Sequence, residues 1–381
     1  MYKKQDINLP RLLFIVSEDW YFVSHRLHLA KTAREAGYEV ALLSRISKYR
    51  ERIETSGVKV FDWSLSRRSC NPLKEYRSVF QIFWTIKKYQ PCIVHAVALK
   101  PVLYTSLICK FTGMRNRVSA LGGLGFIFSS NKISARLLRL LLIIGLRVSL
   151  DGEFSRLILQ NQDDKKIILK SKIIKFEHIR LVRGSGVDTV EFSPRAETNE
   201  IPLVILPARL LWDKGVGDFV DCAKIITQKG IKVRFALVGE RDEHNPKCIS
   251  ASQLKAWIDE GVVEWWGRRE DMSDVYRQAT VVCLPSHREG LPKVLLEAAS
   301  SGRPIVTYDV PGCREVVINE ENGFLVPFRD INCLAFALEK LIVAPALREQ
   351  MGKNGRRKVL KEFSQEKIAA ETLTIWNEVL A

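Results

Sequence analysis

The hydrophobic pattern of the chain repeats one arrangement: a short apolar run of strand length, a loop, and then an amphipathic stretch of helical length. Apolar runs of strand length occur at 11–16, 39–43, 58–61, 90–95, 118–121, 179–183, 202–207, 233–238, 262–266, 280–284 and 304–307. Strands that alternate with helices form parallel sheets covered by helices on both faces. The pattern therefore predicts an α/β protein, and its 381 residues suffice for two domains.

A break in the pattern at about 190–200 predicts the boundary between these domains. Serine and proline residues punctuate the chain there, as is typical of connecting segments. We expect a first domain over residues 1–192 and a second over 193–363. The last stretch, 364–381, has apolar residues at roughly helical spacing and predicts a terminal helix.

The most informative stretch is Cys283–Pro327, which indicates a strand, a loop, a helix and a second strand. Pro292 suits the start of the helix because its missing N–H would be unpaired there anyway, and Gly302 ends it. The start of such a helix is an anion site suited to phosphate. Glu289 and Glu297 are either ordinary surface acids or acceptors of hydrogen bonds from hydroxyl groups. The second possibility points to a nucleotide sugar, which carries both phosphate and vicinal hydroxyls.

Two cations follow the first strand of the second half. Arg209 and Lys214 lie in the loop that leads to Gly215 and a predicted helix. They can converge there on a diphosphate, the arginine through a two-pronged contact and the lysine as a point charge. The spacing of the arginine and the lysine alone would not indicate a binding site. Their position in a loop between a strand and a helix does indicate one.

These stretches together resemble the retaining glycosyltransferases of family 4, which have the GT-B fold of two Rossmann-like domains. The resemblance rests on the Glu-x7-Glu segment, which opens with Pro-Ser-x-x-Glu-Gly and continues as Leu-Leu-Glu-Ala-x-x-x-Gly-x-Pro-x-Val. The turns at 309–315 and 322–323, the Arg-x4-Lys pair and the Gly-x-Gly-Val-Asp loop at 184–188 also match. It extends from about residue 12 to the end of the chain. In GT-B enzymes the terminal helix often packs back on the first domain.

The resemblance implies a role for each matching residue of the second domain. Glu297 would accept the ribose hydroxyls, and Glu289 would hold hydroxyls of the donor sugar. Arg209, Lys214 and the backbone at 290–293 would stabilise the departing diphosphate, so that no metal cofactor is expected. The further donor-binding residues that we expect are Gly290, Leu291, Pro292, Lys293, Gly123 and Arg268. Gly123 belongs to a Gly-Gly-Leu-Gly-Phe string that resembles the family loop facing the donor phosphates.

The first domain is expected to bind the acceptor. Its Ser-His-Arg-Leu string contains His25 and Arg26 and resembles the subgroup that extends undecaprenyl-diphosphate-linked sugars. The basic loop at 67–74 fits the diphosphate of such a polyprenyl-linked acceptor. His25 could equally be a helix-start residue that bonds to the backbone.

The catalytic residues of the first domain stay open. Related enzymes often carry a histidine near the reacting centre two places after the position of His95, where this chain has Val97. His95 or Lys100 could take the catalytic role, or neither could. His95 could equally lie at the edge of the core.

The composition narrows the class of partner and the compartment. The formal net charge is +16, which fits anionic substrates or an anionic membrane better than nucleic acid, because no nucleic-acid-binding motif accompanies it. The eight cysteines show no metal-like or CxxC spacing and indicate reduced thiols. No signal peptide or long uncharged apolar run is found. We expect a cytoplasmic protein that is peripheral on the inner face of the cell membrane.

A leucine-rich basic stretch at 132–150 has two interpretations. It is a buried helix whose arginines extend to the surface, or an interfacial patch that rests on anionic lipid headgroups. The net charge keeps the second interpretation open.

The resemblance implies a retaining hexosyltransferase that moves a sugar from a UDP-sugar to a lipid-diphosphate-linked sugar. An N-acetylhexosamine such as GalNAc is the expected sugar, and the product would feed a surface polysaccharide, a lipopolysaccharide O-antigen or a glycoprotein glycan. With no convincing enzyme nucleophile, front-face attack by the acceptor is expected. The alternatives are a UDP-GlcNAc 2-epimerase of the same fold and a non-catalytic GT-B binding protein. The Glu-x7-Glu and Arg-x4-Lys motifs argue against both.

Overall fold

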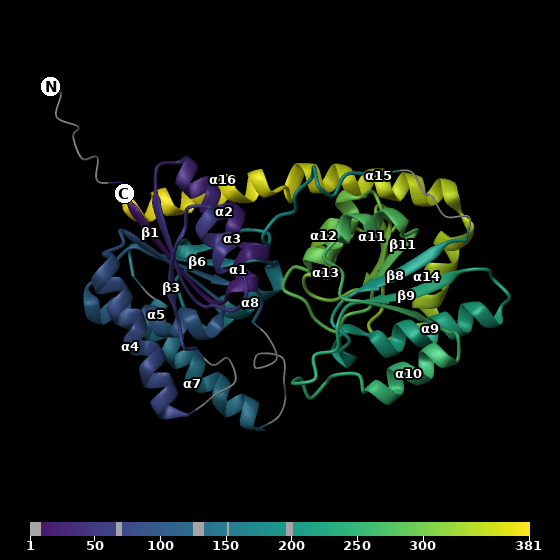
Figure 1. Cartoon of the computed structure of the whole chain (residues 1–381), viewed down its shortest axis with the longest axis horizontal. Coiled ribbons are helices and arrows are strands. Elements are labelled where there is room, and N and C mark those ends of the chain that lie inside the picture. Colours follow the sequence, from purple (N-terminus) through teal and green to yellow (C-terminus); the bar gives the residue numbers. More distant parts are fainter. Residues whose placement is uncertain (1–8, 66–70, 125–132, 151, 196–200) are drawn as a thin grey trace. The chain divides into compact units, whose positions relative to one another are not determined.

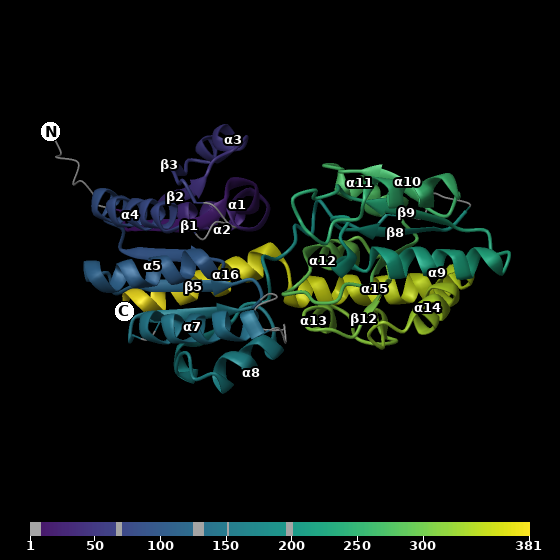
Figure 2. The same ribbon diagram turned by 90° about the horizontal axis from the view of Figure 1, so that it is seen from below.

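The computed structural model describes residues 9–65, 71–124, 133–150, 152–195 and 201–381, without the side chains of 133–138. The chain forms two compact units. Unit 1 comprises Met1–Ser185 and Glu366–Ala381, and unit 2 comprises Gly186–Gln365. Each unit is a parallel sheet with helices on both faces (Figures 1 and 2). The α/β architecture expected from the hydrophobic pattern is confirmed.

Unit 1 is built on a seven-stranded sheet of order β3-β2-β1-β4-β5-β6-β7. Its strands are β1 (Arg11–Glu18), β2 (Glu39–Arg45), β3 (Lys59–Asp62), β4 (Ile93–Val97), β5 (Arg117–Leu121), β6 (Ser155–Leu159) and β7 (Ile179–Leu181). Its helices are α1 (Asp19–His25), α2 (Leu27–Glu35), α3 (Arg50–Thr55), α4 (Pro72–Tyr89), α5 (Leu99–Thr112), α7 (Ile133–Leu150), α8 (Gln162–Lys170), the short η1 (Phe176–His178) and α16 (Gln365–Leu380). Figure 1 shows α2 and α16 on one side of the sheet and α4, α5 and α7 on the other.

Both faces of this sheet are buried, and β1 shows why its sequence is continuously apolar. Successive side chains of a strand point to opposite faces. Leu12 and Phe14 pack into the core on the α2 and α16 side. Leu13 and Ile15 pack into the core on the α4, α5 and α7 side. A strand buried on both faces has no polar positions to alternate with.

Unit 2 is built on a six-stranded sheet of order β10-β9-β8-β11-β12-β13. Its strands are β8 (Leu203–Pro207), β9 (Arg234–Val238), β10 (Glu264–Gly267), β11 (Val281–Leu284), β12 (Ile305–Tyr308) and β13 (Gly323–Val326). Its helices are the short η2 (Trp212–Lys214), α9 (Val216–Gln228), α10 (Ala251–Asp259), α11 (Met272–Gln278), α12 (Lys293–Ser300), α13 (Cys313–Val316), α14 (Ile331–Val343) and α15 (Pro345–Glu362). In Figure 1, α11, α12 and α15 cover one side of the sheet and α9 and α10 the other.

The chain passes between the units at two neighbouring segments. The N–H of Val187 donates to the carbonyl of Phe363 at 2.9 Å, and the N–H of Gln365 donates back to Val187 at 3.1 Å. Val187 and Phe192 belong to the core of unit 2. The division after Ser185 therefore comes earlier than residue 192, where the sequence placed it, because those two apolar side chains anchor the segment to unit 2.

The terminal helix α16 packs into the core of unit 1. Trp376 is fully buried there, beside Ile368 and Ile375. At the surface of the same helix, Glu378 forms ion pairs with Arg156 of β6 at 3.0 Å and Arg180 of β7 at 2.7 Å. The end of the chain thus completes one face of the first sheet.

Three local features complete the description of the chain. Helix α1 follows the first strand, and the carboxylate of its first residue, Asp19, accepts hydrogen bonds from the backbone N–H groups of Ser47 and Tyr49. The seven cysteines in the described part of the chain are free thiols, and Cys70 lies outside it. In that same part, no helix combines the length and apolarity that a membrane crossing requires.

Candidate active site

The middle of the second sheet brings the two motifs together. β8 and β11 are neighbours, and the chain continues from β8 to one side of the sheet and from β11 to the other. Ligands of such sheets bind outside the carboxyl ends of the strands at this point of reversal. Arg209 and Lys214 follow β8, while Glu289 and Glu297 follow β11. The fold therefore places both motifs at the expected ligand-binding edge.

The loops after β8 and β11 are locked to each other through their backbones. The Ser286 hydroxyl and the His287 N–H both donate to the carbonyl of Asp213, at 3.2 and 3.0 Å. Gly215 has a φ of +72°, and a Cβ placed on it would lie 2.0 Å from the carbonyl oxygen of Pro285. A side chain at this position would force the loops apart, so the glycine after the Arg-x4-Lys pair is a packing requirement.

Lys214 and Glu289 form the central ion pair of this site. The ammonium group of Lys214 donates to Oε1 of Glu289, and the side chains are only 23% and 13% exposed. The N–H of Glu289 in turn donates to the carbonyl of Pro311 at 3.3 Å. A third loop, which follows β12, thus helps to fix the position of the carboxylate.

Arg209 lies at the outer side of the same edge. Its guanidinium pairs with Asp242 at 2.8 Å, and its side chain is 58% exposed. The segment of Asp242 is held against the β8 loop, since the N–H of Leu210 donates to Glu240 and that of Ile249 donates to Leu210. Such an exposed guanidinium can rotate toward an anionic ligand, because exchanging one surface carboxylate for another acceptor costs little.

Glu297 is held inside the first turns of α12. The Tyr276 hydroxyl donates to its Oε2 at 3.0 Å, and the Lys293 ammonium lies 3.3 Å from Oε1. Burial raises the pKa of Glu297, and Lys293 and the tyrosine hydroxyl partly oppose that shift. The same burial raises the pKa of Tyr276 well above its usual range. This carboxylate is therefore rigidly oriented before any ligand binds.

Helix α12 begins where the sequence predicted a helix start suited to an anion. Pro292 is the residue just before the helix, with a φ of −74°, and Lys293 is its first residue. Unpaired N–H groups and the positive dipole end of a helix attract phosphate oxygens. Gly290 and Leu291 lead into this helix, and the close approach of Gly312 to the carbonyl of Gly290 sets their path.

Arg268 follows the edge strand β10. It lies 3.9 Å from both Glu240 and Glu270, and its side chain is 47% exposed. Its strand is separated from β8 by β9. It therefore shares the carboxyl edge of the sheet with Arg209 but stands farther from the point of reversal.

The first sheet has a corresponding point of reversal between β1 and β4. A pocket of about 200 Å³ lies at their carboxyl ends and is lined by Glu18, Tyr21, Ala98, Gly123 and their neighbours. Ala98 has a φ of +80°, which alanine rarely adopts. Such a strained residue between a central strand and its helix commonly marks a functional site. Gly123 thus lines a pocket of unit 1, while Gly125 and Phe126 of its string lie outside the described residues.

Of the two acceptor residues predicted in unit 1, Arg26 lies in the interior and His25 is half-buried. Arg26 is 3% exposed, and its guanidinium donates to the carbonyl of His25 at 3.2 Å. Burial lowers its pKa. His25 itself is half-buried and stacks on Tyr21 with 4.2 Å between ring centroids. The burial of Arg26 argues against the expected direct contact with an acceptor.

His95 is a core residue and not a surface residue of the site. It is 1% exposed, stacks on Phe14 at 5.1 Å between ring centroids, and accepts a hydrogen bond at Nδ1 from Trp376 at 3.1 Å. Burial, helped by the charge of Arg26, lowers the pKa of His95 well below its usual range. Its side chain points to the α16 face of β4, so the structure does not support the catalytic role expected from its sequence position.

Lys100 forms an ion pair with a carboxylate of α4. It lies in the first turn of α5, and its ammonium pairs with Glu75 at 2.7 Å. Tyr104 donates to the other oxygen of Glu75 at 2.6 Å. Lys100 therefore ties α5 to α4, which gives it a structural role whatever part it has in catalysis.

Comparison with known proteins now decides the class of this chain. The family "Glycosyl transferases group 1" matches residues 189–358 and the family "Glycosyl transferase 4-like" matches residues 11–161. This chain is a GT-B glycosyltransferase. The first match falls in unit 2 and the second in unit 1. These matches confirm the fold and the family expected from the motifs. They do not support the alternatives of a UDP-GlcNAc 2-epimerase or a non-catalytic binding protein.

Among curated proteins, the glycosyltransferase is similar to two enzymes of lipid-linked glycan assembly. It is 25% identical to the N,N'-diacetylbacillosaminyl-diphospho-undecaprenol alpha-1,3-N-acetylgalactosaminyltransferase of Campylobacter jejuni, over 93% of this chain and 95% of that protein. It is 24% identical to the UDP-Gal:alpha-D-GlcNAc-diphosphoundecaprenol alpha-1,3-galactosyltransferase of Escherichia coli, over 78% of each chain.

Solved structures share the fold of the glycosyltransferase. The sucrose-phosphate synthase of Thermosynechococcus elongatus superposes with a TM-score of 0.78 at 18% identity, over 97% of this chain and 99% of that one. The Anabaena protein HepE in complex with UDP superposes with a TM-score of 0.75 at 18% identity, over 96% and 99%. At this identity, the similarity concerns the fold alone.

Several residues of the site carry no sequence signal of their own. Tyr276 and Asp242 hold Glu297 and Arg209 in place, yet neither belongs to a motif. Ala98 would be found only through its backbone angle. Tyr276 and Asp242 act through partners that lie 21 and 33 positions away in the sequence, which is why the motifs did not reveal them.

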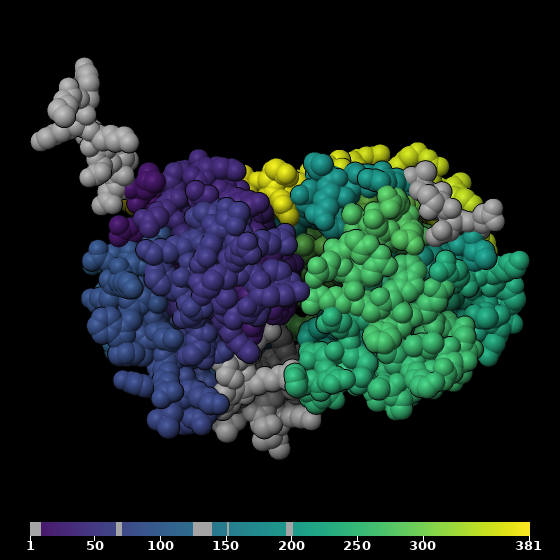
Figure 3. All heavy atoms as spheres, in the orientation of Figure 1, coloured from purple at the N-terminus to yellow at the C-terminus, as the bar shows by residue number. Residues whose placement is uncertain are grey.

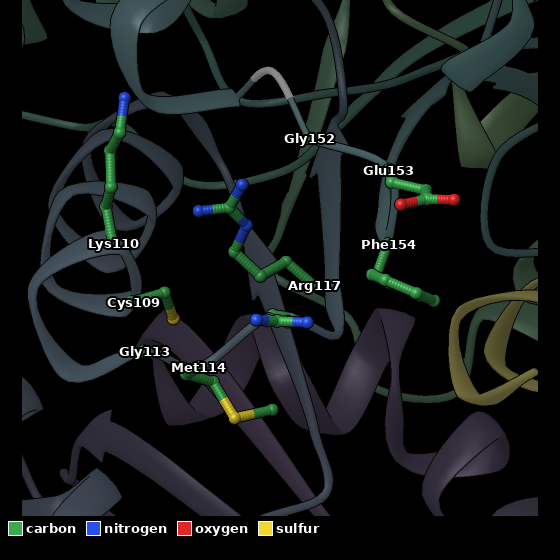
Figure 4. A pocket seen from close by; sticks show the side chains of 9 residues that line it. Cys109, Lys110, Gly113, Met114, Arg117, Gly152, Glu153 and Phe154 are labelled. Atoms are coloured by element: carbon green, nitrogen blue, oxygen red, sulfur yellow. The ribbon is translucent and has the colours of Figure 1, made fainter.

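A further hollow of the glycosyltransferase lies elsewhere in unit 1. It measures about 340 Å³ and is lined by Lys110, Arg115, Arg117 and Glu153 among others. In Figure 4 the carboxylate of Glu153 points away from Arg117. Arg117 is the first residue of β5, so this hollow lies at the amino edge of the sheet. It is thus separate from the pocket at the carboxyl ends of β1 and β4.

Proposed function

We propose that this glycosyltransferase moves a sugar from a UDP-sugar to a sugar linked to a polyprenyl diphosphate, with retention of anomeric configuration. The observation that carries the proposal is the pairing of Lys214 with Glu289 beside a helix start that holds Glu297, with Arg209 exposed on the loop after the neighbouring strand β8. It combines cations for a diphosphate with carboxylates for hydroxyl groups. The two relatives named above, whose names specify acceptors linked to diphosphoundecaprenol, support the choice of acceptor.

The proposed donor lies along the carboxyl edge of the second sheet. The fixed carboxylate of Glu297 accepts hydrogen bonds from the ribose hydroxyls. The start of α12, with Lys214 and Arg209, holds the diphosphate. Glu289 accepts hydroxyls of the donor sugar and orients the Lys214 ammonium at the same time. An N-acetylhexosamine is the proposed sugar, since the Campylobacter relative is named as an N-acetylgalactosaminyltransferase.

The proposed chemistry is electrostatic. The bond between the anomeric carbon and the diphosphate oxygen breaks, and the acceptor hydroxyl attacks from the same face while its proton passes to the departing diphosphate. Negative charge grows on that oxygen, and preorganised donors directed at it lower the barrier, each by about 3–4 kcal/mol. Lys214, Arg209 and the helix terminus supply this stabilisation, so we propose that no metal ion is needed.

We also propose that unit 1 binds the acceptor at a membrane. A polyprenyl chain keeps the diphosphate at the bilayer surface, so the enzyme must work as a peripheral protein on the inner face of the cell membrane. The exposed apolar residues of α7, which are Leu140, Leu141, Ile144 and Val148, are compatible with such contact. The pocket lined by Glu18, Tyr21 and Ala98 is the proposed acceptor end of unit 1, and Gly123, which also lines it, keeps its expected role toward the donor phosphates.

The experiment is a transfer assay with a panel of UDP-sugars and a synthetic polyprenyl-diphosphate-linked sugar, in the presence and absence of EDTA. We expect a product one sugar longer by mass spectrometry, an α-linkage by NMR from an α-linked donor, and no loss with EDTA. A β-linked product would refute retention, and loss of activity with EDTA would refute metal independence. Binding of UDP without any transfer would refute the proposed acceptor class.

A further inference from the structure

Helix α4 exposes a row of large apolar side chains. Leu73, Tyr76, Phe80 and Trp84 recur at helical spacing along one side and are 76%, 66%, 46% and 56% exposed. The opposite side of the helix is buried against unit 1 through residues such as Ile82. The space-filling view, in which α4 is blue, shows this segment at the surface (Figure 3). We call these four residues the α4 stripe.

The side chains of the α4 stripe form a connected apolar surface. The ring of Phe80 lies 6.0 Å from that of Tyr76 and 5.9 Å from that of Trp84, measured between centroids. The outer face of a helix on an α/β sheet is normally polar. Contiguous apolar patches of this kind mark places where a protein meets another protein, a membrane or a ligand.

The charged residues of α4 favour an anionic partner. Lys74 and Arg77 lie in its first turns, and Lys87 and Lys88 lie in its last turn. The only carboxylate of the helix is Glu75, which faces inward and binds Lys100 and Tyr104. The outer face of α4 therefore combines aromatic residues with cations and carries no acidic residue.

A hollow at the amino end of α4 continues this positive surface. It measures about 390 Å³ and is lined by Arg45, Ser64, Leu65, Lys74 and Arg77. Arg45 lies 3.8 Å from Glu18, and no carboxylate is among the described residues that line the hollow. Its size and charge suit a phosphate group beside the apolar stripe.

We propose that α4 is the helix through which the enzyme docks on an anionic lipid bilayer. The α4 stripe enters the boundary between headgroups and acyl chains, where tyrosine and tryptophan are favoured. The flanking cations and the Arg45 hollow contact lipid phosphates. The inference rests on the proposed peripheral contact with the membrane and names the surface that makes it. One interpretation of the sequence placed that surface on the leucine-rich stretch at 132–150.

Helix α7 is the natural comparison. It exposes Leu140, Leu141, Ile144 and Val148, but no aromatic residue is among them. Arg147 of α7 donates to the backbone carbonyls of Ser171 and Lys172 at 2.8 and 3.0 Å. That cation is therefore used within unit 1, whereas the basic residues of α4 flank its apolar row. Among the side chains that the structure describes, α4 exposes Lys74, Arg77, Lys87 and Lys88, whereas α7 exposes Arg147 and half-buries Arg139.

The test is co-sedimentation of the full chain with vesicles of phosphatidylcholine, alone or mixed with phosphatidylglycerol. The test variant carries Phe80→Ser with Trp84→Ser, and the matched control carries Leu140→Ser with Ile144→Ser. We expect wild type to bind the mixed vesicles, the α4 variant to bind at least about tenfold less, and the α7 variant to bind nearly as wild type. Arg77→Glu with Lys88→Glu should abolish the preference for phosphatidylglycerol.

Two controls keep the outcomes distinct. Circular dichroism and UDP binding, measured on each variant, report whether the fold is intact. Transfer to a short-chain, detergent-free acceptor should be unchanged in the α4 variant, because Phe80 and Trp84 lie outside the catalytic edge.

Each contrary result has one meaning. If wild type binds no vesicles, the proposed membrane contact fails. If wild type binds and the α4 variant binds equally, or only the α7 variant loses binding, the inference on α4 fails while the proposed function stands. A wild-type dimer that the α4 substitutions convert to a monomer, without loss of vesicle binding, would assign the stripe to a second copy of the chain and overturn the inference.

Discussion

The ammonium group of Lys214 donates a hydrogen bond to Oε1 of Glu289, although 75 positions separate the two residues in the sequence. One belongs to the Arg-x4-Lys pair and the other to the Glu-x7-Glu segment, which the adjacency of β8 and β11 brings together. The two motifs are therefore one structural unit. A substitution in either motif changes the charge that its partner faces.

Replacing Glu289 is predicted to lower kcat. In Glu289→Ala the half-buried Lys214 loses its carboxylate and the donor sugar loses an acceptor, so we expect kcat to fall by roughly 100-fold. Glu289→Gln keeps an oxygen that Lys214 can reach and should lose less. Steady-state kinetics check both variants. Glu243→Ala, an exposed carboxylate paired with Arg241, is the control, and wild-type kcat in Glu289→Ala would rule out the assignment.

Glu297 is predicted to act on nucleotide affinity. Losing a charged acceptor of two ribose hydroxyls costs about 1.5–3 kcal/mol, so Glu297→Ala should bind UDP roughly 10–100-fold more weakly by calorimetry. Tyr276→Phe, which removes only the orienting hydroxyl, should weaken UDP less. Equal affinity of wild type and Glu297→Ala would place the ribose elsewhere.

The pH dependence of UDP binding follows from the raised pKa of Glu297. The carboxylate form is present above that pKa and is lost as the pH falls through it. Affinity for UDP should therefore begin to fall on acidification at a higher pH than an ordinary glutamate would give. Glu297→Gln should lack this part of the profile. A profile that is the same in both proteins would contradict the role of the carboxylate.

Arg209 is predicted to act on the diphosphate through its guanidinium. Arg209→Ala should lower kcat/KM by about 100-fold, and Arg209→Lys should not restore it, because an ammonium cannot make the two-pronged contact. Arg234→Ala is the matched control, since that residue forms an exposed ion pair with Glu264 at the amino edge of the same sheet. Full rescue by lysine would argue for a point-charge role.

Gly215 is predicted to be essential for packing and not only for backbone freedom. Gly215→Ala brings a Cβ within 2.0 Å of the Pro285 carbonyl oxygen, whereas Gly230 has a similar φ of +76° and nothing within 4 Å. Gly230→Ala should cost about 1 kcal/mol in the free energy of unfolding, and Gly215→Ala about 3 kcal/mol or more. Urea denaturation measures both. Equal losses would show that the β8 and β11 loops can separate freely.

His95 is predicted to make the fold sensitive to acid. Its pKa is lowered in the folded protein, so the unfolded chain binds the extra proton first. Its contribution to stability is then full above the unfolded pKa of about 6.5 and declines as the pH falls below it. His95→Asn keeps an acceptor for Trp376 and should flatten this decline in urea melts at pH 5 to 8. An unchanged slope would mean that another group titrates.

The sequence was most informative where function depends on local chemistry. The strand–loop–helix pattern at Cys283–Pro327 predicted the start of α12, and the fold then placed the loop of Arg209 and Lys214 at the same edge of the sheet, with Lys214 paired to Glu289. These predictions needed only periodicity, helix-end chemistry and a resemblance that spans both domains. They depend little on the details of packing.

The sequence was least informative where a role depends on which face of an element is buried. His95 and Arg26 stand in strings that look functional, yet the packing of α16 and α2 covers both. The sequence analysis assigned no role to the aromatic residues of α4, and only the buried face of the helix shows that they point outward. One-dimensional spacing does not reveal which side of a helix the sheet will cover.

The most direct test of the donor site is a single-turnover assay with a UDP-N-acetylhexosamine and a polyprenyl-diphosphate-linked sugar, comparing wild type with Lys214→Ala. Wild type should form the elongated lipid-linked product, and Lys214→Ala should form it at least about 100-fold more slowly while still binding UDP. A variant that transfers the sugar at the wild-type rate would contradict the claim that this edge of the second sheet stabilises the departing diphosphate.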